Sequence, residues 1–267
     1  MNLSAIIAAR HRATAGFSTE AQSYFDRLDT AGDTTYTAYR QPLANYIDSL
    51  VSLGGAYWDT MLCATSFVGV GIEGITVPLR DGMTVPTQSN FVAGDLNQLT
   101  GLKGDGSTKY IDTGTKFNDC PQNDFSMSVN VTETLLESNS GNYLAYQSFV
   151  DGVSQISSSN DSGVSNNDLS IRCQTRNVNT ISDQGSVEDF TGVSRELSTE
   201  YLVQYGASST TITQASQAPA NQIISLFGSS SINKTNARFA TFHIGRSLDM
   251  PTLRGLQNTL ISEIAAI

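Results

Sequence analysis

The chain has 267 residues, of which 39% are hydrophobic and only 15% are charged, and its formal net charge at pH 7 is −10. This composition allows one sizeable buried core and argues against a disordered polyelectrolyte. The acidic balance argues against nucleic acid and against an anionic membrane as partners.

The first 55 residues are predicted to be helical. Residues 3–9 are mostly apolar, but the run is short and no basic residue precedes it, so we expect no secretory signal. Further along, Thr19 and Gln22 have the spacing of a capping box, and Gly32 fits a helix end. The face of this first helix would carry Ala21, Tyr24, Phe25 and Leu28.

A second helix is expected to begin near residues 37–42 and to end at Gly54-Gly55. Its apolar face would carry Leu43, Tyr46, Ile47, Leu50 and Val51. A short link makes the two helices an antiparallel pair. We expect this region to anchor or pack the protein, with Tyr24, Phe25 and Tyr46 as candidate contacts to a partner.

After Gly55 the pattern changes to short aromatic and β-branched runs separated by turn residues. In residues 125–132, apolar Phe125, Met127, Val129 and Val131 alternate with polar Ser126, Ser128, Asn130 and Thr132, and the polar set is expected on a solvated sheet face. Further strands are expected in YLAYQSFVDG, LSIRCQ, YLVQYGAS, TTITQAS, IISLFGSSS and RFATFHIG, and the stretch after Gly55 is expected to begin the strand region. The pattern predicts a mainly β fold, a sandwich or jelly roll of two antiparallel sheets.

The chain is predicted to end in a helix over residues 249–265. Ser247 or Asp249 can cap this helix, and Pro251 suits its first turn. Its apolar stripe would consist of Leu253, Leu256, Leu260, Ile261 and Ile264. The expected organisation is a helical region over residues 1–55 and a β-sandwich with its C-terminal helix over residues 56–267.

The glycine-rich stretch over residues 99–114 could be a phosphate loop, a metal loop or a turn. Gly101 and Gly106 have the spacing of a Walker loop, but Ser107 stands where the lysine belongs and a strand-like run follows instead of a helix. The favoured reading is a turn at Asp105-Gly106 and a strand that ends at Gly114. A calcium site at Asp105 and Asp112 is the weaker alternative.

This stretch, GDGSTKYIDTG, resembles the first sandwich strand of concanavalin A-like (lectin/glucanase, laminin-G-like) domains of tailed-bacteriophage virions. RFATFHIGRSLDMPTLRGLQNTLISEI is similar to the closing strand and helix of such domains, and the matching positions are Phe242, Ile244, Gly245, Ser247 and Leu248. The resemblance runs from about residue 19 onward, although residues 138–199 match only in strand-like composition. It implies a jelly-roll fold and a place in a virus particle.

No catalytic constellation is recognisable in the sequence. The Glu-x-Asp-x-x-Glu run of related glucanases is missing; Glu133 and Glu137 share a strand face but are separated by Leu135, and Glu196 and Glu200 are expected to be solvated. His11 and His243 are the two histidines, and His243 is expected to lie outward or at an edge. We therefore expect no enzymatic activity and no cofactor.

Cys63, Cys120 and Cys173 are few and far apart in the chain. Because they form no C-x-x-C pair, a zinc site or a redox motif is not expected. We expect buried reduced thiols in a protein made in a reducing bacterial cytoplasm.

These observations predict a non-enzymatic structural protein of a phage virion, in the first place a homo-oligomeric head decoration protein that contacts the major capsid protein. The alternative is a tail-associated adhesin or carbohydrate-binding protein that contacts tail proteins and a host-surface glycan. A sugar platform could then be formed by Tyr143, Tyr146, Tyr201 and Tyr205, with loop asparagines such as Asn166 and Asn167.

Overall fold

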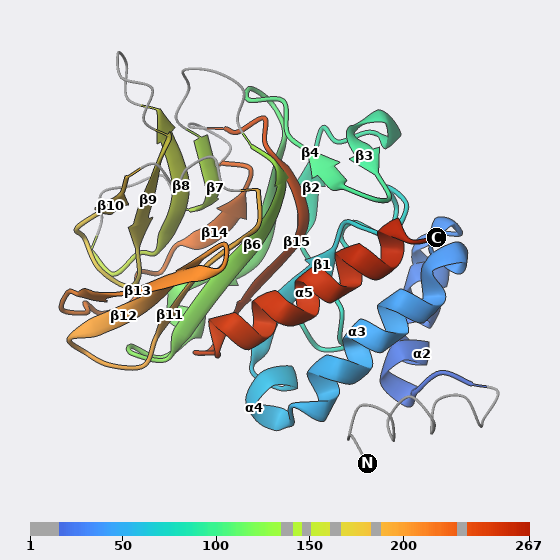
Figure 1. Cartoon of the computed structure of the whole chain (residues 1–267), viewed down its shortest axis with the longest axis horizontal. Helices are drawn as coiled ribbons and strands as arrows, with labels where there is room; N and C mark the ends of the chain where they lie inside the picture. Colours follow the sequence, from blue (N-terminus) through green and yellow to red (C-terminus); the bar gives the residue numbers. More distant parts are fainter. Residues whose placement is uncertain (1–15, 135–140, 146–150, 161–166, 183–187, 229–233) are drawn as a thin grey trace.

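The computed structural model describes residues 16–134, 141–145, 151–160, 167–182, 188–228 and 234–267. In this part of the chain two antiparallel sheets face each other, and helices cover one of them (Figure 1). The mainly β sandwich with an N-terminal helix pair and a C-terminal helix is therefore confirmed. None of the described helices combines the length and the apolar composition needed to cross a membrane.

The two sheets consist of strands from distant parts of the chain. The eight-stranded sheet, in spatial order, contains β13 (Ser208–Thr213), β12 (Glu200–Tyr205), β11 (Phe190–Arg195), β6 (Phe125–Glu133), β15 (Arg238–Gly245), β4 (Gly101–Lys103) and β3 (Leu96–Asn97), with β1 (Met61–Ser66) also paired to β15. The seven-stranded sheet contains β10 (Asn179–Ile181), β9 (Asn167–Arg172), β8 (Gln155–Asn160), β7 (Gly141–Ala145), β14 (Ile223–Leu226), β5 (Tyr110–Lys116) and β2 (Thr87–Ser89). The helices are α2 (Thr19–Ala31), α3 (Arg40–Ser52), α4 (Gly55–Trp58) and α5 (Met250–Ala265), with 3₁₀ turns η1 (Thr35–Tyr39), η2 (Ala93–Asp95) and η3 (Phe117–Asp119).

The core lies between the sheets, and β6 at the centre of the larger sheet shows why. Phe125, Met127 and Val129 on one face of β6 are fully buried. Their antiparallel partners on β15 are Phe242, opposite Val129, and Ile244, opposite Met127. Paired residues in an antiparallel ladder share a face, so the apolar alternation read from the sequence builds one continuous inner layer.

The other face of the larger sheet is not solvated at β6, and this corrects the sequence prediction for residues 126–130. Ser126, Ser128 and Asn130 of β6 are all buried. Helix α5 lies diagonally across this face (Figure 1), and the Asn130 amide donates to Asn258 Oδ1 of α5 at 2.8 Å. The helical layer therefore covers polar side chains whose alternation alone indicated an exposed face.

The N-terminal helix pair forms as expected, apart from its first cap. Ser18, not Thr19, caps α2, because its Oγ accepts a hydrogen bond from the Ala21 amide at 3.1 Å. Gly32 ends α2 in the left-handed conformation with φ 84°, which glycine adopts without a Cβ clash. The second helix ends just before Gly54, and Gly54, like Gly32, has a positive φ.

The helix pair packs onto the sandwich through its apolar face. Tyr24 and Phe25 are 0% exposed and Tyr46 is 5% exposed. The prediction that these residues contact a partner is therefore wrong for the folded chain, since their rings pack inside the same molecule. The ring of Phe25, for example, stacks on Tyr36 at a centroid distance of 5.4 Å.

Polar contacts fix the same packing between α2 and the segment that follows β1. The Asp33 carboxylate is buried and accepts from the amides of Thr35 and Gly71 at 2.8 and 2.7 Å. Arg27 on α2 donates to the carbonyls of Pro78 and Leu79. Helix α3 in turn lies alongside α5 (Figure 1). The division of the chain at residue 55 stays a prediction.

Several element boundaries differ from the sequence prediction. Residues 55–58 form the short helix α4 before the first strand, and residues 67–86 form no strand. Strands β8 and β11 were not expected, although β11 is central to its sheet. Both are rich in serine, threonine or glycine, so local β propensity is weak and sheet context decides.

All three cysteines are free and buried, as predicted. Burial raises the pKa of the Cys120 thiol to about 12, helped by the nearby Asp124 carboxylate. These thiols are therefore not thiolate nucleophiles at neutral pH.

Candidate functional site

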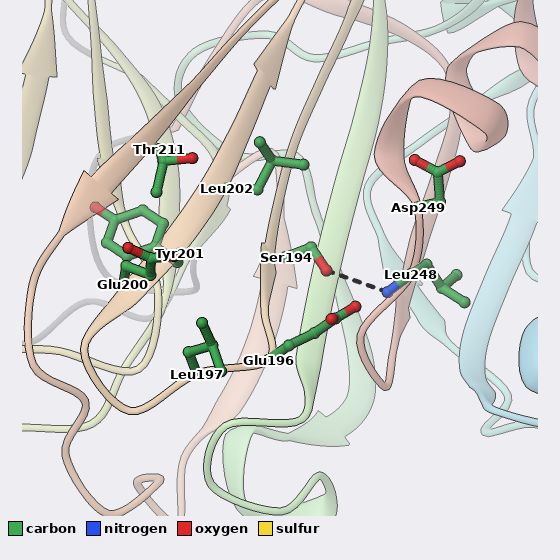
Figure 2. A pocket seen from close by; sticks show the side chains of 9 residues that line it. All are labelled: Ser194, Glu196, Leu197, Glu200, Tyr201, Leu202, Thr211, Leu248 and Asp249. Carbon is green, nitrogen blue, oxygen red and sulfur yellow. Dashed lines mark hydrogen bonds between the residues drawn. The ribbon is translucent and has the colours of Figure 1, made fainter.

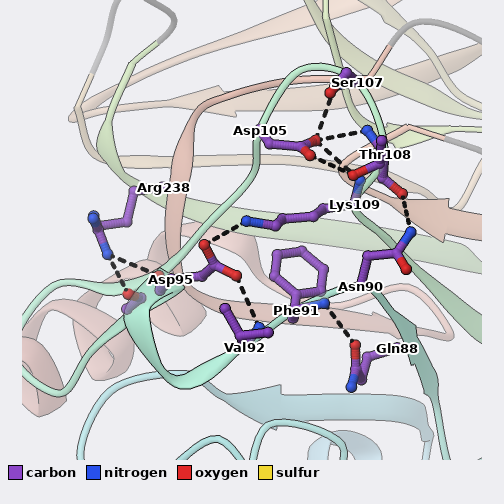
Figure 3. Close-up of polar contacts among 11 residues, drawn as sticks. Gln88, Asn90, Phe91, Val92, Asp95, Asp105, Ser107, Thr108, Lys109 and Arg238 are labelled. Carbon is purple, nitrogen blue, oxygen red and sulfur yellow. Dashed lines mark hydrogen bonds and ion pairs between the residues drawn. The ribbon is translucent and has the colours of Figure 1, made fainter.

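The glycine-rich stretch is a turn, as the favoured reading predicted. It connects β4 to β5, and Asp105 organises it (Figure 3). One carboxylate oxygen of Asp105 accepts from the amides of Ser107, Thr108 and Lys109 at 2.8–3.0 Å, and the other accepts from the Thr108 hydroxyl. Partial burial would raise the pKa of Asp105, but these hydrogen bonds outweigh it and lower the pKa well below its usual range.

The strand after this turn does not end at Gly114. It continues to Lys116, and Gly114 occupies a positive φ of 68° within it. The Asp112 carboxylate accepts from the Gly114 amide at 2.8 Å. Among the described residues no group of three or more histidine, cysteine or acidic side chains could hold a metal ion. Both calcium candidates therefore have local structural roles, and calcium binding stays an untested prediction.

Beside the turn, ion pairs and hydrogen bonds join the β3–β4 corner of the larger sheet to Lys109 and to Arg238 of β15 (Figure 3). Lys109 pairs with Asp95, and Arg238 donates to the carbonyls of Asp95 and Gly101. Glu133 pairs with both Lys103 and Arg238. Hydrogen bonds from Lys103 and then Arg238 lower the pKa of Glu133, whereas a glycosidase general acid needs a raised pKa. Glu137, its proposed neighbour, lies outside the described residues.

His243 is not at an outward or edge position, which corrects the sequence interpretation. It is buried on the central strand β15, beneath the helical layer, and its Nε2 lies 3.5 Å from Ser126 Oγ. Ser126 donates to the Arg246 carbonyl instead. Because both side chains are buried, the Ser126 hydroxyl is not accessible to a substrate as a nucleophile.

A pocket of about 280 Å³ opens where the β11–β12 turn approaches the start of α5 (Figure 2). The pocket lies on the helix-covered side of the larger sheet, just beyond the N-terminal end of α5. Its lining consists of Ser194, Glu196, Leu197, Glu200, Tyr201, Leu202, Thr211, Leu248 and Asp249. The volume is near the lower end of the roughly 300–1,000 Å³ typical of small-ligand sites.

Strand pairing and one hydrogen bond set the shape of this pocket. Leu202 faces Ser194 on β11 and Thr211 on β13, so these three side chains share one sheet face. Ser194 Oγ accepts from the Leu248 amide at 3.1 Å (Figure 2), which holds the β15–α5 connection against the sheet. Leu197 is 54% exposed at the rim and gives the pocket an apolar edge.

The pocket is acidic, and two of its carboxylates are available. In the described part of the chain, no hydrogen bond or ion pair engages the carboxylate of Glu196 or Glu200. Asp249 accepts from the Thr252 hydroxyl. Burial and the nearby Asp249 carboxylate raise the pKa of Tyr57, and Glu196 contributes less. The arrangement offers hydrogen-bond acceptors to a ligand that brings donors or positive charge.

A second pocket, of about 390 Å³, lies at the other end of α5 and is a weaker candidate. Its carboxylate Asp189 accepts from both Arg254 and Asn258 of α5. Partial burial would raise the pKa of Asp189, but these hydrogen bonds lower it. Its polar groups therefore already hold the helix on the sheet.

Two of the four tyrosines proposed as a sugar platform are not exposed, Tyr205 is half-buried, and Tyr146 lies outside the described residues. Tyr143 and Tyr201 are both buried, and the Tyr201 hydroxyl accepts from Asn179 at 3.0 Å. Tyr201 contributes to the pocket floor but presents no open ring face.

Sequence reasoning placed Glu196 and Glu200 in solvent and did not connect them with Asp249. The nearest signal was two glutamates four residues apart around a Ser-Thr turn. Nothing local indicated that residues 248 and 249 lie beside this turn, because about 50 residues of chain separate them.

Comparisons with known proteins are informative for the fold alone. No protein-family model matches the chain, and no curated protein matches its sequence. Among solved structures, botulinum neurotoxin type C, whose cell entry depends on two ganglioside molecules, matches with a TM-score of 0.54 and 14% identity over 76% of this chain and 51% of that chain. The binding domain of botulinum neurotoxin DC in complex with SialylT matches with a TM-score of 0.50 and 13% identity, over 76% of this chain and 51% of that chain.

A phage structure is also among the matches. The enzymatically active domain of tailspike protein 2 of bacteriophage CBA120 matches with a TM-score of 0.41 and 11% identity, over 66% of this chain and 29% of that chain. This likeness is too low to support an argument. The chain spans about half the length of the toxin structures it matches. With the two-sheet topology, the two toxin matches show the fold to be a β-sandwich.

Proposed function

We propose that the protein is a non-catalytic surface protein of a tailed-phage particle whose sandwich binds a carbohydrate at the acidic pocket. The observation that carries this proposal is the pocket itself, with the free carboxylates of Glu196 and Glu200 beside the exposed Leu197. Carboxylates accept hydrogen bonds from sugar hydroxyls, and an apolar edge suits the C–H face of a sugar ring. The fold supports the proposal, since the toxin domains that share it engage gangliosides and a sialyl compound.

The charge of the pocket narrows the class of sugar. Three acidic side chains and no basic side chain line it among the described residues. A sialylated, sulfated or phosphorylated glycan would face like charge there. The pocket therefore fits a neutral sugar or, better, one that carries a free amine.

Binding by glucosamine oligosaccharides tests the site. Titration calorimetry should detect binding, and Glu200→Gln or Glu196→Gln should weaken it about tenfold, as expected when a charged hydrogen-bond acceptor is lost. Glu188→Gln, an exposed carboxylate change at the second pocket, is the control and should leave the affinity unchanged. Binding of sialylated glycans only, or equal affinity in all variants, would contradict the proposal.

The absence of catalysis is part of the proposal and has its own test. Incubation with neutral and amino-sugar polysaccharides should release no reducing ends. Hydrolysis that disappears in Glu196→Gln would instead identify the pocket as a glycosidase site.

Head decoration remains a second candidate, favoured by the resemblance of residues 104–114 and 238–264 to virion proteins. Mass spectrometry of gradient-purified particles can compare the copy number of this chain with that of the major capsid protein. A ratio near one or a simple fraction of it indicates a symmetric head protein. A few copies per particle indicate a tail adhesin, and absence from the particle contradicts both virion placements.

A further inference from the structure

We propose that Arg195 is the positioning residue of the acidic pocket. Its buried guanidinium fixes the turn over residues 196–200, which carries Glu196, Leu197 and Glu200. For the ligand this inference rests on the proposed function, but the role of Arg195 in the pocket can be tested without a ligand.

Arg195 is the largest side chain of the described chain that is fully buried. Its Nε donates to the Cys173 carbonyl at 2.8 Å, and its Nη2 donates to the Gln214 carbonyl at 3.0 Å. Its Nη1 donates to the carbonyls of Leu197 and Glu200 at 3.0 and 3.2 Å. One planar group thus binds both ends of the pocket turn and two other chain segments.

These segments belong to different parts of the sandwich. Cys173 directly follows β9 in the seven-stranded sheet, while Gln214 directly follows β13 in the eight-stranded sheet. The amides of Gln214 and Ser216 also donate to the carbonyls of Thr199 and Ser198, both at 2.8 Å. The turn is therefore held from its interior by Arg195 and along its backbone by residues 214–216.

No carboxylate forms an ion pair with Arg195 among the residues that the structure describes. Its guanidinium lies 5.0 Å from the centroid of the Tyr201 ring, a cation–π contact beneath the pocket. Burying a cation without a counter-charge is unfavourable unless its donors are satisfied. Arg195 donates its hydrogen bonds to main-chain carbonyls, so it fixes the position of the backbone and does not neutralise a carboxylate.

A lysine cannot replace this arrangement. Its ammonium is a single point on a flexible stem and lacks the planar fork that reaches three segments at once. Without the fork, the carbonyls of Leu197 and Glu200 lose their donor, and the turn gains alternative conformations. Ordering a mobile turn on binding costs free energy, so the pocket should bind its ligand more weakly when Arg195 no longer holds the turn.

Amide hydrogen exchange on Arg195→Lys tests the positioning role. Exchange should become about tenfold or more faster at the amides of Gln214 and Ser216, which donate to the carbonyls of the turn, under native conditions, as expected for a local opening, with little change elsewhere. The matched control is Arg238→Lys, which loses carbonyl contacts at Asp95 and Gly101 away from the pocket. Uniformly faster exchange in Arg195→Lys, or unchanged exchange at Gln214 and Ser216, would overturn the inference.

Calorimetric titration with a glucosamine oligosaccharide is the second readout. Arg195→Lys should bind about tenfold more weakly with the same stoichiometry, whereas Arg238→Lys should bind like the unmodified protein. Unchanged affinity in Arg195→Lys would contradict the inference. If the unmodified protein does not bind, the proposed function fails, and hydrogen exchange alone decides the role of Arg195.

A measurement on the unmodified protein covers the case in which Arg195→Lys does not fold. The Nε–H of Arg195 and the amides of Gln214 and Ser216 should exchange with one common opening rate, observed by NMR. Independent rates would show that Arg195 and the turn open separately, which would overturn the inference.

Discussion

Two polar side chains, one buried and one exposed, show how their surroundings set their charge. His243 lies beneath the helical layer, and its Nδ1 has no hydrogen-bond partner among the residues that the structure describes. Burial lowers its pKa from 6.5 to about 3. Asp105 shows the opposite case, because hydrogen bonds stabilise its charged form. Each residue gives a prediction.

The folded protein should lose stability as the pH falls below 6.5, because His243 binds a proton more readily in the unfolded chain. With a folded-state pKa of about 3, the loss at pH 5 is about 2 kcal/mol. Urea denaturation at pH 7 and pH 5 measures this difference. Carboxylates that are paired in the folded protein lose their contribution to stability only at lower pH. The change in the free energy of unfolding between pH 6.5 and pH 5 therefore reports on His243. His243→Gln should abolish the difference, and equal stability of the unmodified protein at both pH values would contradict the prediction.

Asp105→Ala should lower the free energy of unfolding by about 1 kcal/mol, because the amides of the β4–β5 turn lose their acceptor at an exposed site. Chemical denaturation measures this loss. The same samples test calcium, which should leave the melting temperature of the unmodified protein unchanged. A calcium-dependent rise that disappears in both Asp105→Ala and Asp112→Ala would instead establish a calcium site.

At the scale of elements, α5 links the helices to the sandwich. Its inner face buries Leu253, Leu260 and Ile264 as the sequence predicted. Its polar contacts to Asp189 and Asn130 hold it over the sheet. The helix therefore combines ordinary apolar burial with a register fixed by hydrogen bonds.

Leu260→Ala should destabilise the protein by about 2–4 kcal/mol, as expected when a fully buried leucine is truncated. The neighbouring Thr259→Ala changes an exposed position and should alter stability by less than about 0.5 kcal/mol. Denaturation curves of the two variants make the comparison. Equal and small effects would show that α5 is not part of the cooperative core.

For the whole molecule, one apolar cluster extends from the helix pair through both sheets. Its members include Leu28 of α2, Ile244 of β15 and Leu226 of β14. Such continuity favours a single cooperative unit, since no part can unfold without exposing the core of another.

Differential scanning calorimetry should therefore show one transition whose calorimetric and van't Hoff enthalpies agree. Two separated transitions, with the first removing only helical circular dichroism, would instead show that residues 1–55 unfold on their own. That outcome would support the division of the chain at residue 55.

Local patterns were sufficient for most elements. The alternation over residues 125–131, the apolar spacing of α5 and the glycines that end α2 and α3 each depend on neighbours within a few residues, so they could be predicted. The serine- and threonine-rich β8 and the glycine-containing β11 could not, because their pairing partners stabilise them. The candidate site was missed for the same reason: Glu196 and Glu200 acquire a role only beside Leu248 and Asp249.

The amino-acid sequence by itself determined the mainly β class, the helices at both ends, the turn at Asp105 and the buried thiols, because propensity, periodicity and turn chemistry are local properties. Only the tertiary structure decided that the polar face of β6 is covered, that Tyr24, Phe25 and Tyr46 are core residues, and that Arg195 lies beneath an acidic pocket. Which side chains meet depends on how distant segments pack, and polar side chains carry no sequence signal that distinguishes a wet face from a covered one.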